Sequence, residues 1–485
     1  MKKLLALLLA LVMCLSLVAC GGTDAPAEEP AEEPAAEEPA EEPAEEPAEE
    51  PAEEPAEESG KTVLNIWSFT DEVPNMINRY LELNPDFAEK YEIKTTIIAT
   101  TDGLYQPALD QALAAGGEDA PDIYCAEAAF ILKYSQGDAS AFAAPYDDLG
   151  IDTAAAIEAA DIAQYSVDIG TRPSDGKVVG LGYQATGGAF IYRRSIAKDV
   201  WGTDDPAVVA EKIGAGSGDW EQFYAAAAEL KEKGYGIISG DGDLWHAVEN
   251  SSDAGWIVDG KLNIDPKREA FLDLSKQLKD NGYHNDTQDW TDAWYADMKG
   301  TGEKGILGFF GPAWLINYTI DPNCGGAEGT FGDWAVCAPP VGFFWGGTWL
   351  LANDASANKE AVGEIIHWIT LNATEDGLQY AWANGTIDWD NDPATPTAKD
   401  CVASGTVMEI STGDLEILAG QNMFEAFVPA NEYANGKCLT QYDEAINGFW
   451  RDAVRQYTAG EMTRDDAISF FKQQVADNLD VEVEF

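Results

Sequence analysis

Strand-like and helix-like segments alternate along the chain from residue 62 onward. Thr62–Trp67 and Ile93–Ile98 are short runs rich in β-branched residues, which is typical of strands, and helical sequence lies between them. A helix is expected near Tyr105–Ala115, followed by a short strand at Asp122–Tyr124. Strands that alternate with helices predict a parallel sheet with crossover helices. The predicted fold class is therefore α/β.

A second alternating block follows, with strands expected at Val178–Leu181, Gly188–Tyr192 and Gly305–Phe310. Asp219, with Gln222 three residues later, predicts a capping box at the start of a helix. About 425 residues follow the N-terminal segments, which is too many for one hydrophobic core. Two domains are therefore expected.

Two helices are predicted near the C-terminus. One covers Asp443–Thr458, and the other begins after Thr463, where Asp466 completes a second capping box. Each helix has an apolar stripe that predicts packing against the core. The stripes consist of Ile446, Phe449, Trp450, Ala453 and Tyr457 on the first helix, and Ile468, Phe471, Val475 and Leu479 on the second.

The N-terminus has the pattern of an export signal over residues 1–19. Lys2 and Lys3 precede the apolar run Leu4–Leu17, which is too short for a stable membrane span. The end of this segment resembles the bacterial lipobox, in which Cys20 would be lipidated; an ordinary signal with an incidental Cys is the alternative. Because a diacylglyceryl group supplies two chains, it would anchor the protein stably. We therefore expect the chain at the extracellular face of the cell membrane.

Residues 20–60 are predicted to form a disordered acidic linker. Ala27–Glu58 is a near-perfect repeat of Ala-Glu-Glu-Pro. Proline at every fourth position prevents a helix, and the sixteen glutamates repel one another and leave little apolar surface to bury. The segment is therefore expected to act as an extended spacer.

The net charge of −57 restricts the possible partners. Without the acidic linker, residues 59–485 still contain 69 acidic and 27 basic residues. Such a surface repels nucleic acid and anionic membranes. Neutral or cationic solutes fit best, and a lipid anchor is the only expected link to the membrane because no later apolar run reaches 18 residues.

Five cysteines follow the lipobox, an odd number without a C-x-x-C pair. Cys324 and Cys337 flank a Gly-rich segment and could pair in an oxidising environment. Spacing alone does not decide this. The pairing stays open at the level of the sequence.

Motifs for catalysis and cofactors are absent from the sequence. The three histidines show no metal-ligand spacing, and there is no P-loop, G-x-G-x-x-G or G-x-S-x-G motif. Asp388–Asp392 alternates oxygen ligands as calcium loops do, but it lacks the glycine and the final glutamate of such a loop. A solvated acidic turn is favoured there, and we expect no catalytic residue, no cofactor and no metal.

Aromatic residues are abundant and grouped, with fifteen Trp in the chain. Flat apolar rings can stack on the C–H faces of sugars, while neighbouring polar groups bind the hydroxyls. Residues at the carboxyl ends of strands, such as Trp67 and Glu127, lie where open α/β sheets bind ligands. Any single Trp could equally be core, so the grouping carries the prediction. The candidate ligand-binding residues are Trp67, Phe69, Glu127, Trp290, Trp294, Phe310, Trp314, Trp345 and Trp349.

Seven segments in order resemble the extracellular solute-binding lipoproteins of carbohydrate ABC importers, a maltose-binding-protein-like family. The resemblance covers residues 61–485. Its segments are Leu64–Thr70, Ala120–Tyr124, Tyr192–Arg194, Gly308–Trp314, Ala338–Pro340 with Trp345–Trp349, Asn358–Asn372, and Tyr457–Thr463.

The resemblance implies two α/β lobes of the periplasmic-binding-protein type, with a ligand cleft between them. Lobe one would comprise 61–185 plus 345–415, and lobe two 186–344 plus 416–485, with chain crossings near 184–188, near 345 and around 415–425. By position, Trp67 and Glu127 would line lobe one, and Trp314 would give the stacking platform of lobe two. Gly347, with Trp349, would lie at the hinge side and joins the candidate residues. The Trp290–Tyr295 segment matches no motif of the family.

The function implied by the resemblance is capture of a neutral sugar or oligosaccharide and its delivery to the permease subunits of an ABC transporter. The protein would act as a monomer and not as an enzyme. Two alternatives remain: a binding protein for another solute, such as a polyamine or peptide, and a surface glycoside hydrolase. The hydrolase would need two carboxylates at a defined separation across the sugar.

Overall fold

A computed structural model describes residues 60–100, 103–387 and 399–485. The predicted signal peptide, the predicted linker up to residue 59 and the acidic segment Asp388–Asp392 lie outside these ranges. None of the helices in the described ranges combines the length and the apolar character that a bilayer crossing requires.

The first sheet has five strands, and its first three run parallel as the sequence predicts. β1 pairs with β2 on one side and with β3 on the other. β12, on which the chain returns from the second sheet, runs antiparallel to β3, and its first residue, Thr348, pairs with Glu127 at the end of β3. The strand order is β2 (Tyr91–Ile97), β1 (Thr62–Ser68), β3 (Ile123–Glu127), β12 (Thr348–Ala352) and β6 (Gly180–Gly182).

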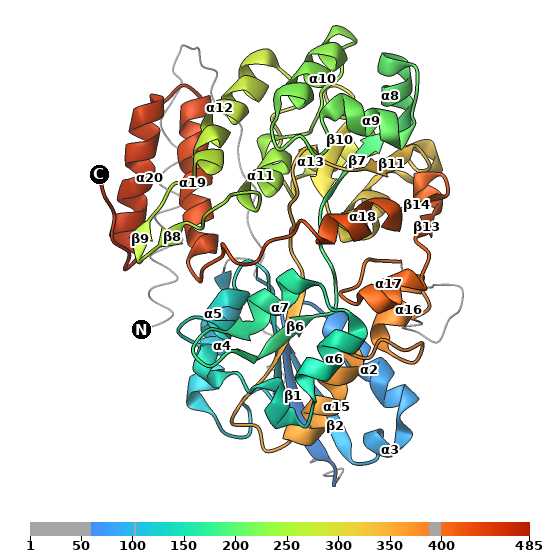
Figure 1. Cartoon of the computed structure of the whole chain (residues 1–485), viewed down its shortest axis with the longest axis vertical. Helices are drawn as coiled ribbons and strands as arrows, with labels where there is room; N and C mark the ends of the chain where they lie inside the picture. The colour runs from blue at the N-terminus through green and yellow to red at the C-terminus, as the bar shows by residue number, and fades with distance from the viewer. Residues whose placement is uncertain (1–59, 101–102, 388–398) are drawn as a thin grey trace, which may run out of the picture. The chain divides into compact units, whose positions relative to one another are not determined.

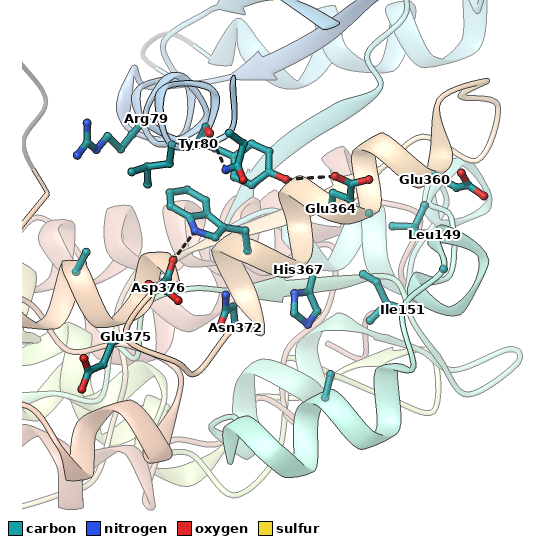
Figure 2. Close-up of a pocket in the computed structure, with 18 of the residues that line it drawn as sticks. Arg79, Tyr80, Leu149, Ile151, Glu360, Glu364, His367, Asn372, Glu375 and Asp376 are labelled. Atoms are coloured by element: carbon teal, nitrogen blue, oxygen red, sulfur yellow. Dashed lines mark hydrogen bonds between the residues drawn. The ribbon is translucent and has the colours of Figure 1, made fainter. Parts of the chain in front are cut away.

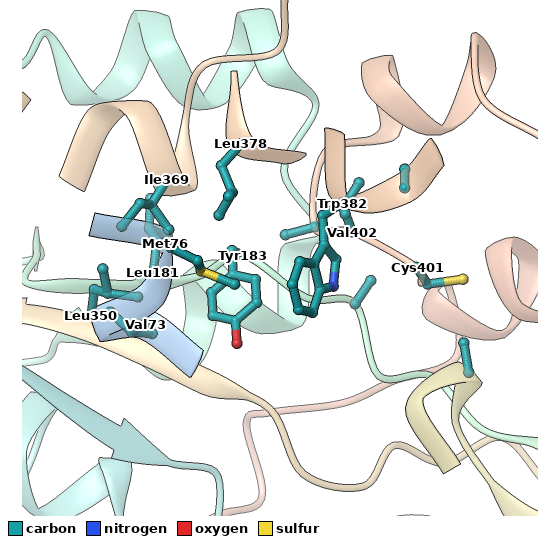
Figure 3. Close-up of a cluster of buried hydrophobic side chains, with 14 of the residues drawn as sticks. Val73, Met76, Leu181, Tyr183, Leu350, Ile369, Leu378, Trp382, Cys401 and Val402 are labelled. Carbon is teal, nitrogen blue, oxygen red and sulfur yellow. The ribbon is translucent and has the colours of Figure 1, made fainter. Parts of the chain in front are cut away.

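Helices cover both faces of this sheet. Because successive strand residues point in opposite directions, each face contributes to its own hydrophobic cluster. On β3, Ile123 and Cys125 join one hydrophobic cluster, and Tyr124 and Ala126 join another. The first cluster includes side chains of α2 (Glu72–Leu83) and α15 (Lys359–Thr370), part of which is drawn in Figure 3. The second includes α4 (Tyr105–Ala115), α5 (Ile131–Ser135) and α7 (Gln164–Gly170), as Figure 1 shows. We call the part built on this sheet lobe one.

The second sheet has the order β10 (Gly308–Gly311), β7 (Ala189–Arg193) and β11 (Trp334–Cys337), and both pairings are antiparallel. The strands expected at Gly188–Tyr192 and Gly305–Phe310 are confirmed as β7 and β10, and their direction is one that the sequence leaves open. Phe190 and Phe310 face a third hydrophobic cluster. That cluster includes α10 (Glu221–Glu232), α11 (Asp241–Glu249), α12 (Pro266–Asn281), α19 (Asp443–Thr458) and α20 (Arg464–Asn478). We call this part lobe two.

Two chain crossings between the sheets run side by side. Gly187 forms an antiparallel bridge with Phe344, and the Trp345 amide donates to the carbonyl of Thr186 at 3.1 Å. Asn431, at the end of α18 (Phe424–Asn431), packs so close that a Cβ on Gly187 would lie 2.5 Å from its Oδ1. Only glycine therefore fits at this point of the crossing.

The predicted helix ends are partly confirmed. Thr463 caps α20 by accepting a hydrogen bond from the Asp466 amide at 3.2 Å, and both predicted apolar stripes pack into the core of lobe two. The predicted box at Asp219 is wrong, because α10 begins two residues later and Asp219 Oδ1 accepts from the Glu221 amide instead.

The cysteines of the described residues are free thiols. Cys324 and Cys337, whose pairing the sequence left open, are both buried in different hydrophobic clusters. Further helices are α3 (Pro85–Ala88), α6 (Thr153–Ala160), α8 (Arg194–Trp201), α9 (Pro206–Ile213), α13 (Asp292–Lys299), α14 (Asp321–Asn323), α16 (Leu378–Asn384) and α17 (Gly405–Glu409).

Candidate ligand-binding site

A cavity of about 380 Å³ lies where the end of β3, the crossing at 344–346 and two helices of lobe two meet. Its volume falls within the range of small-molecule sites. The lining residues from lobe one are Glu127, Ala128, Ala129 and Leu132; those from the crossing are Phe344, Trp345 and Gly346; those from lobe two include Trp245, His246, Glu249, Asn250, Asp443, Asn447 and Arg451.

Several polar atoms of this lining are buried without a partner. Among the described residues, Asn250 Oδ1, Asp443 Oδ2 and Arg451 Nε make no hydrogen bond. Their side chains are nevertheless fixed: Asn250 Nδ2 donates to the Phe344 carbonyl at 2.9 Å, and Asp443 Oδ1 accepts from the Thr440 hydroxyl at 2.6 Å. An unpaired buried polar group costs about 1–3 kcal/mol. Hydroxyl groups of a bound molecule would relieve that cost once the side chains turn to expose these atoms, which are buried in this structure.

Burial raises the pKa of several carboxyl groups that line the cavity and so favours their uncharged form. Burial raises the pKa of Glu127 to about 7 and that of Asp443 to about 7. Burial also raises the pKa of Glu249, whose Oε1 accepts a hydrogen bond from Asn447 Nδ2. Near pH 7 Glu127 and Asp443 can each either accept or donate a hydrogen bond, which suits a ligand with hydroxyl groups.

An aromatic cluster adjoins the cavity and contains three of the predicted residues. The Trp345 ring lies flat on the His246 ring, with centroids 3.5 Å apart and planes inclined by 14°. Trp314 lies 4.7 Å from Trp345 between ring centroids, and its Nε1 donates to the Trp345 carbonyl at 3.1 Å. Trp290 is parallel to Trp314 within 8°, at 6.2 Å. The structure therefore brings Trp290, Trp314 and Trp345 together.

Asp289, one of two neighbouring buried carboxyl groups with Asp243, holds the ring of His246 in place. His246 Nε2 lies 3.2 Å from Asp289 Oδ2. Burial, with the neighbouring Asp289 carboxylate, raises the pKa of Asp243 well above its usual range. Burial is the largest single influence and acts to raise the pKa of Asp289 as well, but the hydrogen bond and attraction of His246, together with Arg451 and Arg455, outweigh it and the pKa is lowered. Asp289 is thus the ionised partner that orients the imidazole.

Other predicted residues lie in the core. Phe310 is 0% exposed and packs among Phe190, Phe223 and Phe343. Trp349 is 1% exposed, and its Nε1 donates to the Ser166 carbonyl at 3.2 Å.

The buried Trp294 is also tied to a polar partner. Its Nε1 donates to Asp243 Oδ1 at 3.0 Å. Trp67 and Phe69, at the carboxyl end of β1, are half-buried against the second cluster of lobe one. Gly347 lies in the crossing with φ +115°, a conformation that favours glycine. Of the predicted residues, Glu127 and Trp345 line the cavity itself.

The polar residues of α11 and α19 were missed by the sequence reasoning. The apolar stripe of α19 packs in the core as predicted, whereas the polar face beside it lines the cavity. Asp443, Asn447 and Arg451 recur every four residues and therefore share one face of the helix. The sequence does contain a signal for this face: the amide of Asn447 stands between the acidic Asp443 and the basic Arg451, beside the apolar stripe of the helix.

A larger hollow of about 1260 Å³ lies on lobe one alone. Figure 2 shows it between α2 and α15, where the Tyr80 hydroxyl donates to Glu364 and the Trp368 indole donates to the Asp376 carbonyl. Lobe two contributes no residue to its lining. A ligand there would not bridge the two sheets, so we take the smaller cavity as the candidate site.

Comparisons with known proteins establish the family and the fold of the chain. The family model for bacterial extracellular solute-binding proteins matches residues 67–376. A solved extracellular solute-binding protein of family 1 superposes with a TM-score of 0.67 at 18% identity, covering 86% of this chain and 99% of that one. No curated protein matches the sequence.

Two further solved structures share the fold. The galacto-N-biose-/lacto-N-biose I-binding protein of an ABC transporter from Bifidobacterium longum, in complex with lacto-N-biose, has a TM-score of 0.62 at 16% identity, covering 88% of this chain and 99% of that one. The sugar-binding protein MalE from Xanthomonas citri has a TM-score of 0.60 at 16% identity, covering 86% and 97%. At such identities the likeness establishes the two-lobe α/β fold, and the family model establishes the membership. The chain belongs to the family of bacterial extracellular solute-binding proteins.

Proposed function

We propose that this protein is the substrate-binding subunit of an ABC importer. It captures a neutral sugar or oligosaccharide between its lobes and delivers it to the permease. One observation carries the proposal: the cavity combines an aromatic face, Trp345, with three buried polar atoms that lack partners. An apolar face with a few fixed polar groups is the combination that a sugar ring needs.

The solved relatives support this choice of ligand. The Bifidobacterium longum protein was solved with lacto-N-biose, and a structural neighbour from Streptomyces glaucescens, the GacH receptor, was solved with acarbose. The cavity between the lobes, the aromatic cluster beside it and the shared fold support the same class of ligand for this chain.

Binding would shift an equilibrium between open and closed lobes without any chemical step. A sugar in the cavity touches Glu127 of lobe one and Asn250 or Asp443 of lobe two at once, and such bridging favours the closed form. Direct contacts between the lobes already exist, because Gln106 Nε2 donates to Glu444 Oε2 at 2.8 Å. The paired crossings at Gly187 and Phe344 provide the hinge.

The lipid anchor completes the proposal. A diacylglyceryl group on Cys20 would hold the receptor at the extracellular face, and the acidic linker would let the lobes reach the permease. Replacement of Cys20 by Ala should release the protein into the medium. Retention of the variant in the membrane fraction would contradict this anchoring.

A thermal-shift screen across neutral sugars, polyamines and peptides tests the function, because a ligand that binds the folded state raises the melting temperature. The proposal predicts that neutral oligosaccharides give the largest shifts. A shift with polyamines alone would favour the second candidate, a receptor for cationic solutes. Glu127, Glu249, Asp443 and Glu444 in one cavity are the observation behind that alternative.

A further inference from the structure

Trp290 is an exposed aromatic residue in an unfavourable backbone conformation. Its side chain is 49% exposed, and its φ is +64°, in the left-handed region that bulky residues avoid. It does not line the cavity. One contact ties it to the core, the buried Trp294 at 5.4 Å between ring centroids, but about half of its side chain is open to solvent.

Both neighbours of Trp290 fix this conformation. Asp289 precedes it and is held by His246 at 3.2 Å. Thr291 follows it, caps α13 through the Trp294 amide and donates to the Gln288 carbonyl at 2.7 Å. Strained residues persist where their surroundings over-determine them, and they gather at ligand-binding positions.

The Trp290 ring continues an aromatic series that begins in the cavity. Trp345 lines the cavity, Trp314 follows at 4.7 Å, and Trp290 comes next, 6.2 Å from Trp314 and 6.0 Å from Trp345 between ring centroids. Trp314 and Trp290 are almost parallel. The three rings therefore form one cluster, in which the exposed Trp290 lies as close to Trp345, at the cavity, as to Trp314.

The surroundings of Trp290 are polar. Gln288 and Asp292 on either side of it are exposed. A surface that docks another protein usually presents a broad apolar patch. A single exposed indole between polar side chains, continuous with a binding cavity, is better suited to one sugar ring with its hydroxyl groups.

We propose that Trp290 forms an outer subsite that binds an additional sugar unit of an oligosaccharide whose inner unit occupies the cavity. The inference rests on the proposed function and narrows the ligand to an oligosaccharide longer than the cavity accommodates. Trp290 would add affinity for the longer sugars without contributing to the binding of the shortest one.

Calorimetric titration with linear gluco- and galacto-oligosaccharides of one to five units tests the outer subsite. Affinity of the unaltered protein should rise with length in the series that it binds. Trp290→Ala should weaken the affinity for the longer sugars about 5- to 150-fold, the range expected for one lost aromatic stacking contact. Its affinity for the shortest sugar should be unchanged. Trp201→Ala, a partly buried Trp on α8 whose Nε1 bonds Glu229, is the matched control and should leave every affinity unchanged.

A second variant separates binding from folding. Trp290→Gly should raise the melting temperature, because glycine adopts positive φ without strain, yet it should show the same selective loss for long sugars. An equal loss for short and long sugars, or no loss for either, would overturn the outer subsite while the proposed function stands. Loss of permease coupling with every sugar affinity intact would instead assign Trp290 to docking and also overturn it. Failure of the unaltered protein to bind any sugar would overturn both proposals.

Discussion

The indole of Trp345 rests on the imidazole of His246, with ring centroids 3.5 Å apart and planes 14° from parallel. His246 is in turn held by a hydrogen bond with Asp289. The crossing between the lobes thus presents its aromatic ring to the cavity from a platform that belongs to lobe two.

The stacked pair predicts different results for two substitutions of His246. His246→Ala removes the platform and leaves Asp289 without its partner, so it should weaken sugar binding about tenfold and lower the free energy of unfolding by about 1–3 kcal/mol. His246→Phe keeps a flat ring under Trp345 but also loses the hydrogen bond. It should therefore lose stability and retain affinity, as measured by calorimetry and thermal melts. Equal affinity losses in the two variants would argue against the stacking role.

Sugar binding should depend on the protonation of Asp443. Burial raises its pKa to about 7, and Oδ2 has no partner while Oδ1 is occupied by Thr440. A hydroxyl that donates to Oδ2 binds the carboxylate more strongly than the neutral acid, so affinity should rise as the pH increases through about 7. Calorimetry between pH 6 and 8 measures this.

Asp443→Asn provides the test of assignment, because its affinity should rise less; Glu127, whose pKa is also about 7, accounts for any remaining rise. Asp477→Asn, an exposed carboxyl on α20 outside the cavity lining, is the control and should keep the rise. A pH profile that survives undiminished in Asp443→Asn would place the titrating group elsewhere.

The free energy of unfolding should decrease as the pH rises, because a buried carboxyl group of lobe one loses its proton. Glu72 accepts a hydrogen bond from the Tyr183 hydroxyl, and burial, aided by Asp400, raises its pKa from 4.5 to about 8. Between these values the folded state holds a proton that the unfolded state has lost, so this group's contribution to stability is present below about pH 4.5 and is lost as the pH rises toward 8.

Glu72→Gln has no such proton, so its stability relative to the unaltered protein should improve from pH 5 to pH 8 in urea unfolding experiments. Glu89→Gln, at an exposed position, should show no such trend. A constant difference between Glu72→Gln and the unaltered protein across this window would contradict the assignment.

Phe310 should matter for stability and not for affinity. It is fully buried among the aromatic residues of lobe two, so Phe310→Ala should cost about 3–5 kcal/mol of unfolding free energy. The exposed Phe331→Ala should cost within about 0.5 kcal/mol. At temperatures where Phe310→Ala is folded, its affinity for sugar should be unchanged. A large affinity loss without a stability loss would return Phe310 to the site.

The fold was predictable where a local pattern decides the structure. The β-branched runs gave β1 and β2, and the apolar stripes of α19 and α20 gave the core of lobe two. Strand direction in the second sheet was not predictable, because periodicity does not encode which way a strand runs. The start of α10 was also missed, since Asp219 offers the same cap chemistry two residues too early.

The site was only partly predictable for a related reason. Aromatic grouping identified Trp290, Trp314 and Trp345, but the same grouping included Phe310, which packs in the core. Sequence does not distinguish an indole that faces a cavity from a ring that faces a sheet. The missing residues, such as Asn447, come from a helix whose apolar face alone was considered.

The affinity of Trp345→Ala for sugar is the most direct test of the account. Trp345 belongs to the crossing, lines the cavity and carries the aromatic series, so its loss should weaken binding of the best oligosaccharide by about 1–3 kcal/mol in calorimetry. Trp201→Ala, the control on α8, should bind as the unaltered protein does. Equal affinities for the Trp345→Ala and unaltered proteins would contradict capture in this cavity.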